Sequence, residues 1–147
     1  MTDKEQRQTW MSLLAKAPAP ELDRLWSALG LAPDYAYLRA PEAGGVMVRG
    51  RAGATGAPFN LGEMTVTRCS VKLSGGEVGH AYVQGRDKAH ATQAALIDAL
   101  MQTAQAQAVR EAVLAPLDEA LQAARAARAA KAAATKVDFF TMARGED

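Results

Sequence analysis

The sequence has few of the residues on which catalytic and metal sites are usually built. Its 147 residues include one cysteine, Cys69, and two histidines, His80 and His90. A single cysteine excludes an internal disulfide, and these three residues do not have zinc-finger or HExxH spacing. A core thiol and two partly exposed imidazoles are the simpler interpretation. A metal site formed by all three in the fold, or a nucleophilic Cys69, is the alternative. We predict no metal site and no catalytic residue.

Long apolar runs and an excess of one charge are also lacking. No stretch of about 18 uncharged apolar residues occurs, which argues against a membrane span. The first residues, MTDKEQRQ, are polar and mixed in charge, unlike a signal peptide. The formal net charge of +1 is not that of a duplex-binding domain, which is normally clearly basic. We therefore expect a cytoplasmic protein that binds neither membranes nor nucleic acid.

Large apolar side chains are scarce for a chain of this length. Hydrophobic residues make up 49% of the sequence, but 33 of them are alanines, beside three Phe, three Tyr and two Trp. A single domain of this size buries about 70% of its unfolded surface, yet alanine fills little of the volume enclosed. The thin core that results indicates a chain that gains stability from a partner surface.

Apolar spacing and turn residues predict an α+β fold: two N-terminal helices, a four-stranded antiparallel sheet, two C-terminal helices and an extended aromatic tail. The first helices are expected at residues 3–17 and 22–29, with Gly30 as a stop. Interleaved polar and apolar residues predict strands at residues 35–39, 45–51, 64–73 and 78–84. In the third strand, the alternation places Cys69, Val71 and Leu73 on one face.

Glycine pairs are expected to form the turns of this sheet. Gly75 and Gly76 give a strong hairpin signal before the last strand, and Gly44 and Gly45 are expected to turn the first strand into the second. Such short links favour antiparallel neighbours. The glycine-rich residues 50–62, GRAGATGAPFNLG, match no phosphate-loop pattern, and we interpret them as a loop between strands.

The C-terminal part is expected to be helix followed by a docking segment. A helix begins near Asp87, Pro116 interrupts the pattern, and a last helix covers residues 117–134. Residues 1–136 then form one domain, and residues 137–147, VDFFTMARGED, a docking tail. Apolar anchors commonly dominate an interface, so the expected partner contacts are Phe139, Phe140, Met142 and Arg144. Packing of these aromatics on the chain's own core is the alternative.

Cations gather where the last strand passes into a helix. Arg86, Lys88 and His90 surround Asp87, which is a suitable helix cap. Because the helix dipole disfavours cations at this end, an anion bound by them and by the free N–H groups would resolve the conflict. We name Arg68, Arg86 and Lys88 as candidate anion-binding residues. Solvated side chains are the alternative.

Three segments, in order, resemble a known family. They are GEMTVTRCSVKL, YVQGRDKAHATQAALIDALMQ and VDFFTMARGED, and RQTWMSLLA near the N-terminus fits as well. Together they resemble the PhnG family, the small G subunit of the bacterial carbon–phosphorus lyase core complex. The resemblance covers nearly the whole chain, and GRDK and VDFFTM are its most specific parts.

The resemblance implies an accessory, non-catalytic subunit of a multi-subunit transferase in phosphonate catabolism. The H, I, J and ATPase-like L subunits are the implied partners, and a homodimer of the isolated chain is a further expectation. The complex transfers the ribose triphosphate of MgATP to a phosphonate. Adenine is displaced and α-D-ribose 1-methylphosphonate 5-triphosphate is formed. MgATP is thus a substrate of the complex, and this chain alone binds no cofactor. The alternative is a small anion- or nucleotide-binding module at the substrate site.

Overall fold

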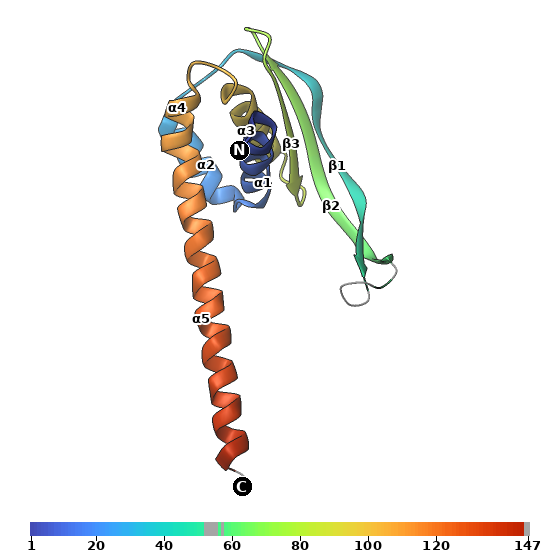
Figure 1. Ribbon diagram of the computed structural model, residues 1–147. Helices are drawn as coiled ribbons and strands as arrows, with labels where there is room; N and C mark the ends of the chain where they lie inside the picture. Colours follow the sequence, from blue (N-terminus) through green and yellow to red (C-terminus); the bar gives the residue numbers. More distant parts are fainter. Residues whose placement is uncertain (52–55, 57, 146–147) are drawn as a thin grey trace.

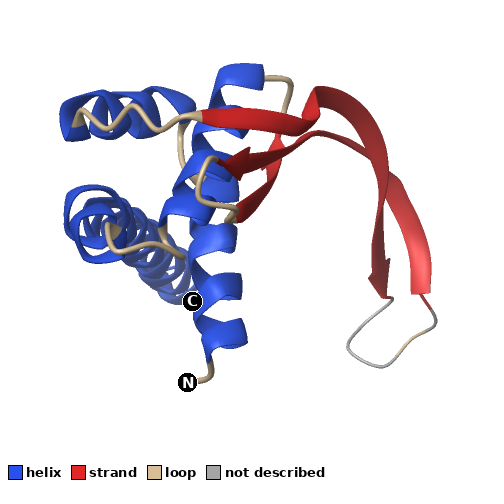
Figure 2. Ribbon diagram, turned by 90° about the horizontal axis from the view of Figure 1, so that it is seen from above, coloured by secondary structure: helices blue, strands red, loops and turns tan. Residues whose placement is uncertain are grey.

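The protein is an α+β fold in which the helices lie on one side of an antiparallel sheet (Figure 2). The computed structural model describes residues 1–51, 56 and 58–145, and it describes their side chains except at residues 51, 58–61 and 137–145. None of the described helices is long and apolar enough to cross a membrane.

The two N-terminal helices are confirmed. Helix α1, Asp3–Lys16, begins with a capping box: the Glu5 N–H donates to Thr2 Oγ1 (3.2 Å), and the Thr2 N–H donates to Glu5 Oε2 (2.8 Å). Helix α2, Ala19–Leu29, ends at Gly30 in the left-handed conformation, with φ 72°. Glycine adopts this conformation without steric cost, which explains why the end of α2 was predicted correctly from Gly30.

The predicted four-stranded sheet is wrong, because the structure has one three-stranded sheet in the order β1-β2-β3. The first two predicted strands are parts of one strand, β1 (Tyr35–Arg51), which pairs with β2 (Pro58–Leu73). Gly44 and Gly45 form no turn and pair with Val66 and Thr65. At Gly45 a Cβ atom would overlap the Glu63 side chain, which is flexible and can turn aside, so close packing does not by itself require glycine there. β1 is an edge strand, where the proline at residue 41 is tolerated.

The second hairpin and the strand faces are confirmed. Strand β3, Val78–Gln84, pairs with β2 in antiparallel register. Gly76 has φ 102°, and its N–H donates to the Leu73 carbonyl (2.9 Å). Cys69, Val71 and Leu73 are buried on the helix side of β2. The glycine-rich loop expected between strands lies partly outside the described residues, and the rest of it belongs to β1, β2 and the bend at residue 56.

The C-terminal part also differs from the prediction of two helices and an extended tail. Helix α3 (Lys88–Leu100) is followed by α4 (Ala106–Val109), the π-helix η1 (Arg110–Leu114) and α5 (Ala115–Gly145), and the last three are continuous. Proline normally conflicts with the carbonyl four residues before it, but the wider π turn precedes Pro116 and relieves that conflict. Alanine is the strongest helix former, and the Ala-rich helix continues into the segment expected to be extended.

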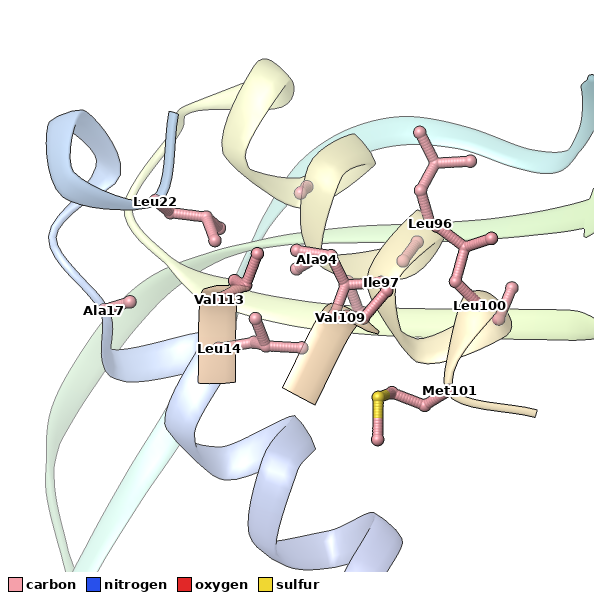
Figure 3. Close-up of a cluster of buried hydrophobic side chains, with 14 of the residues drawn as sticks. Leu14, Ala17, Leu22, Ala94, Leu96, Ile97, Leu100, Met101, Val109 and Val113 are labelled. Carbon is pink, nitrogen blue, oxygen red and sulfur yellow. The ribbon is translucent and has the colours of Figure 1, made fainter. Parts of the chain in front are cut away.

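The core lies between the inner face of the sheet and the helices. Leu14, Ile97, Val109 and Val113 are almost completely buried and point toward one another (Figure 3). α3 crosses the sheet closely at Gly79, where a Cβ atom would overlap the Ala95 carbonyl oxygen. The buried alanines of α3 make this approach possible, because small side chains allow the helix to lie close to the sheet.

Two arms project from this body (Figure 1). β3 pairs only with residues 66–72 of β2, so residues 44–51 and 58–65 form a two-stranded extension that we call the ribbon arm. Beyond Leu121, the helix α5 continues as the helical arm, residues 122–145. Every side chain from residue 122 to 136 is exposed, so this stretch adds nothing to the core.

Candidate interaction surfaces

A buried carboxylate fixes α1 against α3 and β3. Asp98 is fully buried, and its two oxygens accept four hydrogen bonds. Arg7 donates from Nε (3.1 Å) and Nη2 (2.8 Å), Trp10 from Nε1 (2.8 Å) and the His80 backbone N–H (2.8 Å). The hydrogen bond to Asp98 raises the pKa of Arg7 further above its ordinary value, against the opposing effect of burial. The orientation of α1, and with it of Trp10, is therefore set by Asp98.

The residues expected around the start of α3 separate in the structure. Asp87 caps the helix as expected and accepts a hydrogen bond from the His90 N–H (2.9 Å). The His90 ring, however, is buried, and its Nε2 lies 2.8 Å from the Leu14 carbonyl oxygen. The expectation that His90 belongs to a cationic cluster at this turn is therefore wrong. Its imidazole instead forms a hydrogen bond between α3 and α1.

The three candidate anion-binding residues have different surroundings in the structure. Arg86 lines a hollow of about 230 Å³ whose wall includes the carboxylate of Glu63, which would repel an anion. Arg68 lies on the open face of the sheet, with its guanidinium carbon 5.3 Å from the centre of the Tyr82 ring. Lys88 is exposed at the first position of α3. Anion binding by these residues stays a prediction.

The alternative metal site is not formed by its three residues. Cys69 is 1% exposed in the core. His80 is on the opposite face of the sheet, with Nδ1 2.8 Å from Ser70 Oγ. His90 contacts Leu14, as described. Within the described residues, no group of three histidine, cysteine or acidic side chains could hold a metal ion.

Burial raises the pKa of the Cys69 thiol, and a hydrogen bond with Thr92 offsets part of the rise. We expect the native thiol to react with iodoacetamide at pH 8 about a hundredfold more slowly than in urea, because the thiolate is the nucleophile. The pKa of this thiol is therefore higher in the folded chain than in the unfolded chain. Below the unfolded-state pKa the neutral thiol contributes its full stabilisation, and this stabilisation is lost as the pH rises through the folded-state pKa. Equal labelling rates in native buffer and in urea would contradict this assignment.

The expected docking residues Phe139, Phe140, Met142 and Arg144 belong to α5, and their side chains lie outside the described residues. The backbone is helical here, which corrects the extended tail. Whether these residues bind a partner stays a prediction.

A groove beside α1 is a feature that sequence reasoning missed. It has a volume of about 1060 Å³ and lies between α1 on one side and η1 and the start of α5 on the other. Trp10 and Leu13 contribute apolar surface from α1, and Leu114 and Leu121 from the opposite wall. Nothing in a local pattern joins residues 10 and 121, but the spacing of Leu114 and Leu121 places them on one helix face.

Two projecting arms and an open groove indicate a subunit that binds other proteins. Residues 5–145 match the family model described as phosphonate metabolism protein PhnG. A curated relative from Rhizobium meliloti (strain 1021) is 51% identical over 142 residues, which cover 97% of this chain and 91% of the relative. That relative is named alpha-D-ribose 1-methylphosphonate 5-triphosphate synthase subunit PhnG. The chain therefore belongs to the PhnG family, which confirms the resemblance seen in its motifs.

Proposed function

We propose that this chain is an accessory subunit of α-D-ribose 1-methylphosphonate 5-triphosphate synthase and acts in phosphonate catabolism. The relative from Rhizobium meliloti bears the name of a subunit of that enzyme, and the family match extends over residues 5–145. The partners of this chain are other subunits of the complex. The H, I, J and ATPase-like L subunits are those that the family resemblance implies. MgATP is a substrate of the assembled complex, and this chain holds no cofactor of its own.

The helical arm is the observation that carries this proposal. A 31-residue helix such as α5 is about 46 Å long, and helices in proteins gain most of their stability from packing. In this chain the side chains of residues 122–136 are all exposed. Alanine-rich sequence keeps such a helix formed without tertiary contacts. The arm is therefore a preformed surface, and a partner subunit can bind it at little cost in conformational entropy.

The ribbon arm supports the same interpretation. A two-stranded hairpin alone is at best marginally stable in water, and residues 44–51 and 58–65 extend beyond the strand β3 that would widen it. Contact with another subunit would stabilise this extension. The body, held together by the core and by Asp98, then presents two arms to the subunits that bind MgATP and the phosphonate.

The contribution of the last residues is tested by stopping the chain after Lys136. The full chain is expected to co-elute with the other subunits in size-exclusion chromatography with light scattering. The shortened chain is expected to bind at least about tenfold more weakly, because it lacks the anchors Phe139, Phe140 and Met142 and the charge of Arg144. Failure of the full chain to join the other subunits would contradict the proposed function.

A control separates docking from folding. Thermal unfolding of both versions shows whether the last residues stabilise the chain itself. Equal binding by the two versions, with lower stability of the shortened one, would mean that the aromatics pack on the chain's own core.

A further inference from the structure

The groove has one wall that is fixed and one that continues into the helical arm. On α1, Trp10 lines the groove and donates its indole N–H to Asp98 (2.8 Å). On the other side, Leu114 and Leu121 line the groove just before the exposed stretch of α5 begins. A ligand seated in the groove can therefore continue along the arm without crossing any other element.

The spacing along this wall is that of a helix-packing seam. Leu114, Asp118, Leu121 and Arg125 all line the groove, and they are separated by four, three and four residues. Side chains at such spacing share one face of a helix and pack against a second helix. The next position of the seam is Arg128, which lies on the exposed arm. The groove and this face of the arm thus form one continuous surface for a helix.

The charges on this surface are uneven. Lys16, Arg110 and Arg125 line the groove, and residues 120–135 contain three cations and no acid. Neither these groove cations nor Arg128 forms an ion pair with any described residue. The groove also holds two acids, Glu5 and Asp118, which accept hydrogen bonds from the Thr2 N–H and the Gln122 side chain and keep their negative charge. With Arg128, the surface has four cationic side chains against two acidic ones, an excess of positive charge beside an apolar floor.

We propose that the groove and the Arg125–Arg128 face of α5, here called the α1/α5 seat, bind an acidic, amphipathic helix of another subunit. The inference rests on the proposed function and specifies the partner's chemistry. Large apolar side chains of that helix fill the space between Trp10 and Leu121, as in other helix-in-groove complexes. Its carboxylates pair with Arg125 and Arg128 further along the arm, which also fixes the direction in which the helix lies.

A second copy of this chain fits the α1/α5 seat less well. A two-fold interface brings the same patch of both copies together, so each copy would present the same excess of cations to the other. Like charges at such close range repel, and no acids on this stretch of α5 compensate. The charge pattern therefore favours a different, acidic partner over the homodimer expected from the sequence.

A pair of variants with the same change in net charge tests the seat. Arg125→Gln with Arg128→Gln removes two positive charges from the seat. Ala126→Glu with Ala130→Glu adds two negative charges on the opposite face of α5, since successive residues are turned by about 100°. Binding of each variant to the other subunits, purified together without this chain, is measured by biolayer interferometry at two salt concentrations.

The seat variant is expected to bind about tenfold more weakly at low salt, and its affinity is expected to depend less on salt. The matched control is expected to bind like the unchanged chain. Equal loss in both variants, no loss in either, or loss only in the control would overturn the inference. The proposed function would stand in each of these cases, because the unchanged chain still binds. Absence of binding by the unchanged chain would instead refute the proposed function.

The occupant is identified in the assembled complex by placing a photo-crosslinking benzoylphenylalanine at Leu121. Mass spectrometry is expected to find it joined to a helical segment of another subunit that carries several acids beside large apolar residues. A crosslink to a second copy of this chain, a crosslink to a segment without acids, or no crosslink in the intact complex would overturn the inference.

Discussion

Replacing Asp98 with alanine is expected to lower the free energy of unfolding by about 3 kcal/mol. The substitution removes the acceptor of four hydrogen bonds. Water can reach the Arg7 side chain, which is 37% exposed, but the hydrogen bonds from Trp10 and His80 are partly buried and end on a carboxylate that is fully buried. Buried donors left without acceptors carry most of the cost.

Urea unfolding followed by circular dichroism measures this loss, provided that the slope of the transition is unchanged. Glu119→Ala is the matched control, because it removes a carboxylate from an exposed position of α5, and it is expected to change stability by less than about 0.5 kcal/mol. If Asp98→Ala cost no more than this control, the carboxylate would not hold α1 in place.

Replacing Gly79 with alanine is expected to cost about 3 kcal/mol, the upper end of the usual range for overpacking. The added Cβ would overlap the Ala95 carbonyl oxygen and lie 2.7 Å from the Ala99 nitrogen. Both atoms belong to the backbone of α3, so neither can rotate away. α3 must instead move off the sheet, and the contacts of the core beneath it are weakened.

Gly75→Ala is the control for this prediction, because it adds the same methyl group in the same hairpin. There the new Cβ would meet the carboxylate of Glu77, at 2.5 Å from Oε1, and this flexible side chain can turn aside. A change of less than about 1 kcal/mol is expected. Thermal unfolding of both variants measures this difference. Equal losses of stability would show that α3 does not approach β3 as closely as the structure indicates.

The parts of the fold that the sequence predicted are those with local signals. Gly30 ends α2, Gly75 and Gly76 turn β2 into β3, and Asp87 caps α3, each through a few neighbouring residues. The alternation around Cys69 also gave the correct faces of β2. The family was identified from motifs rather than from any property of the fold.

The parts that failed depend on contacts between distant segments. Glycines at residues 44 and 45 suit a turn or a strand equally well, and only their pairing with Val66 and Thr65 of β2 shows that they belong to a strand. Pro116 signals a break only if the preceding turn is an α-helix, whereas η1 is a π-helix. Asp98 pairs with Arg7, which is 91 positions away in the sequence, and no local pattern predicts this pairing. The groove between α1 and α5 was missed for the same reason.

These features together explain how a small chain with a thin core can serve a larger enzyme. Close packing of α3 on β3 and the Asp98 hydrogen bonds give a stable body from few large side chains. The remaining sequence is used for arms that extend beyond the body (Figure 1). Because residues 122–136 are exposed, changes there are expected to affect assembly more than folding.

Hydrogen exchange of the isolated chain and of the assembled complex tests most directly whether the helical arm is an interaction surface. In the isolated chain, amides of residues 122–136 should exchange much faster than those of α3, because a helix without tertiary contacts opens locally at low cost. In the complex, the same amides should become strongly protected, while those of α3 change little. Unchanged fast exchange of residues 122–136 in the complex would contradict the account, since no partner would then cover the arm.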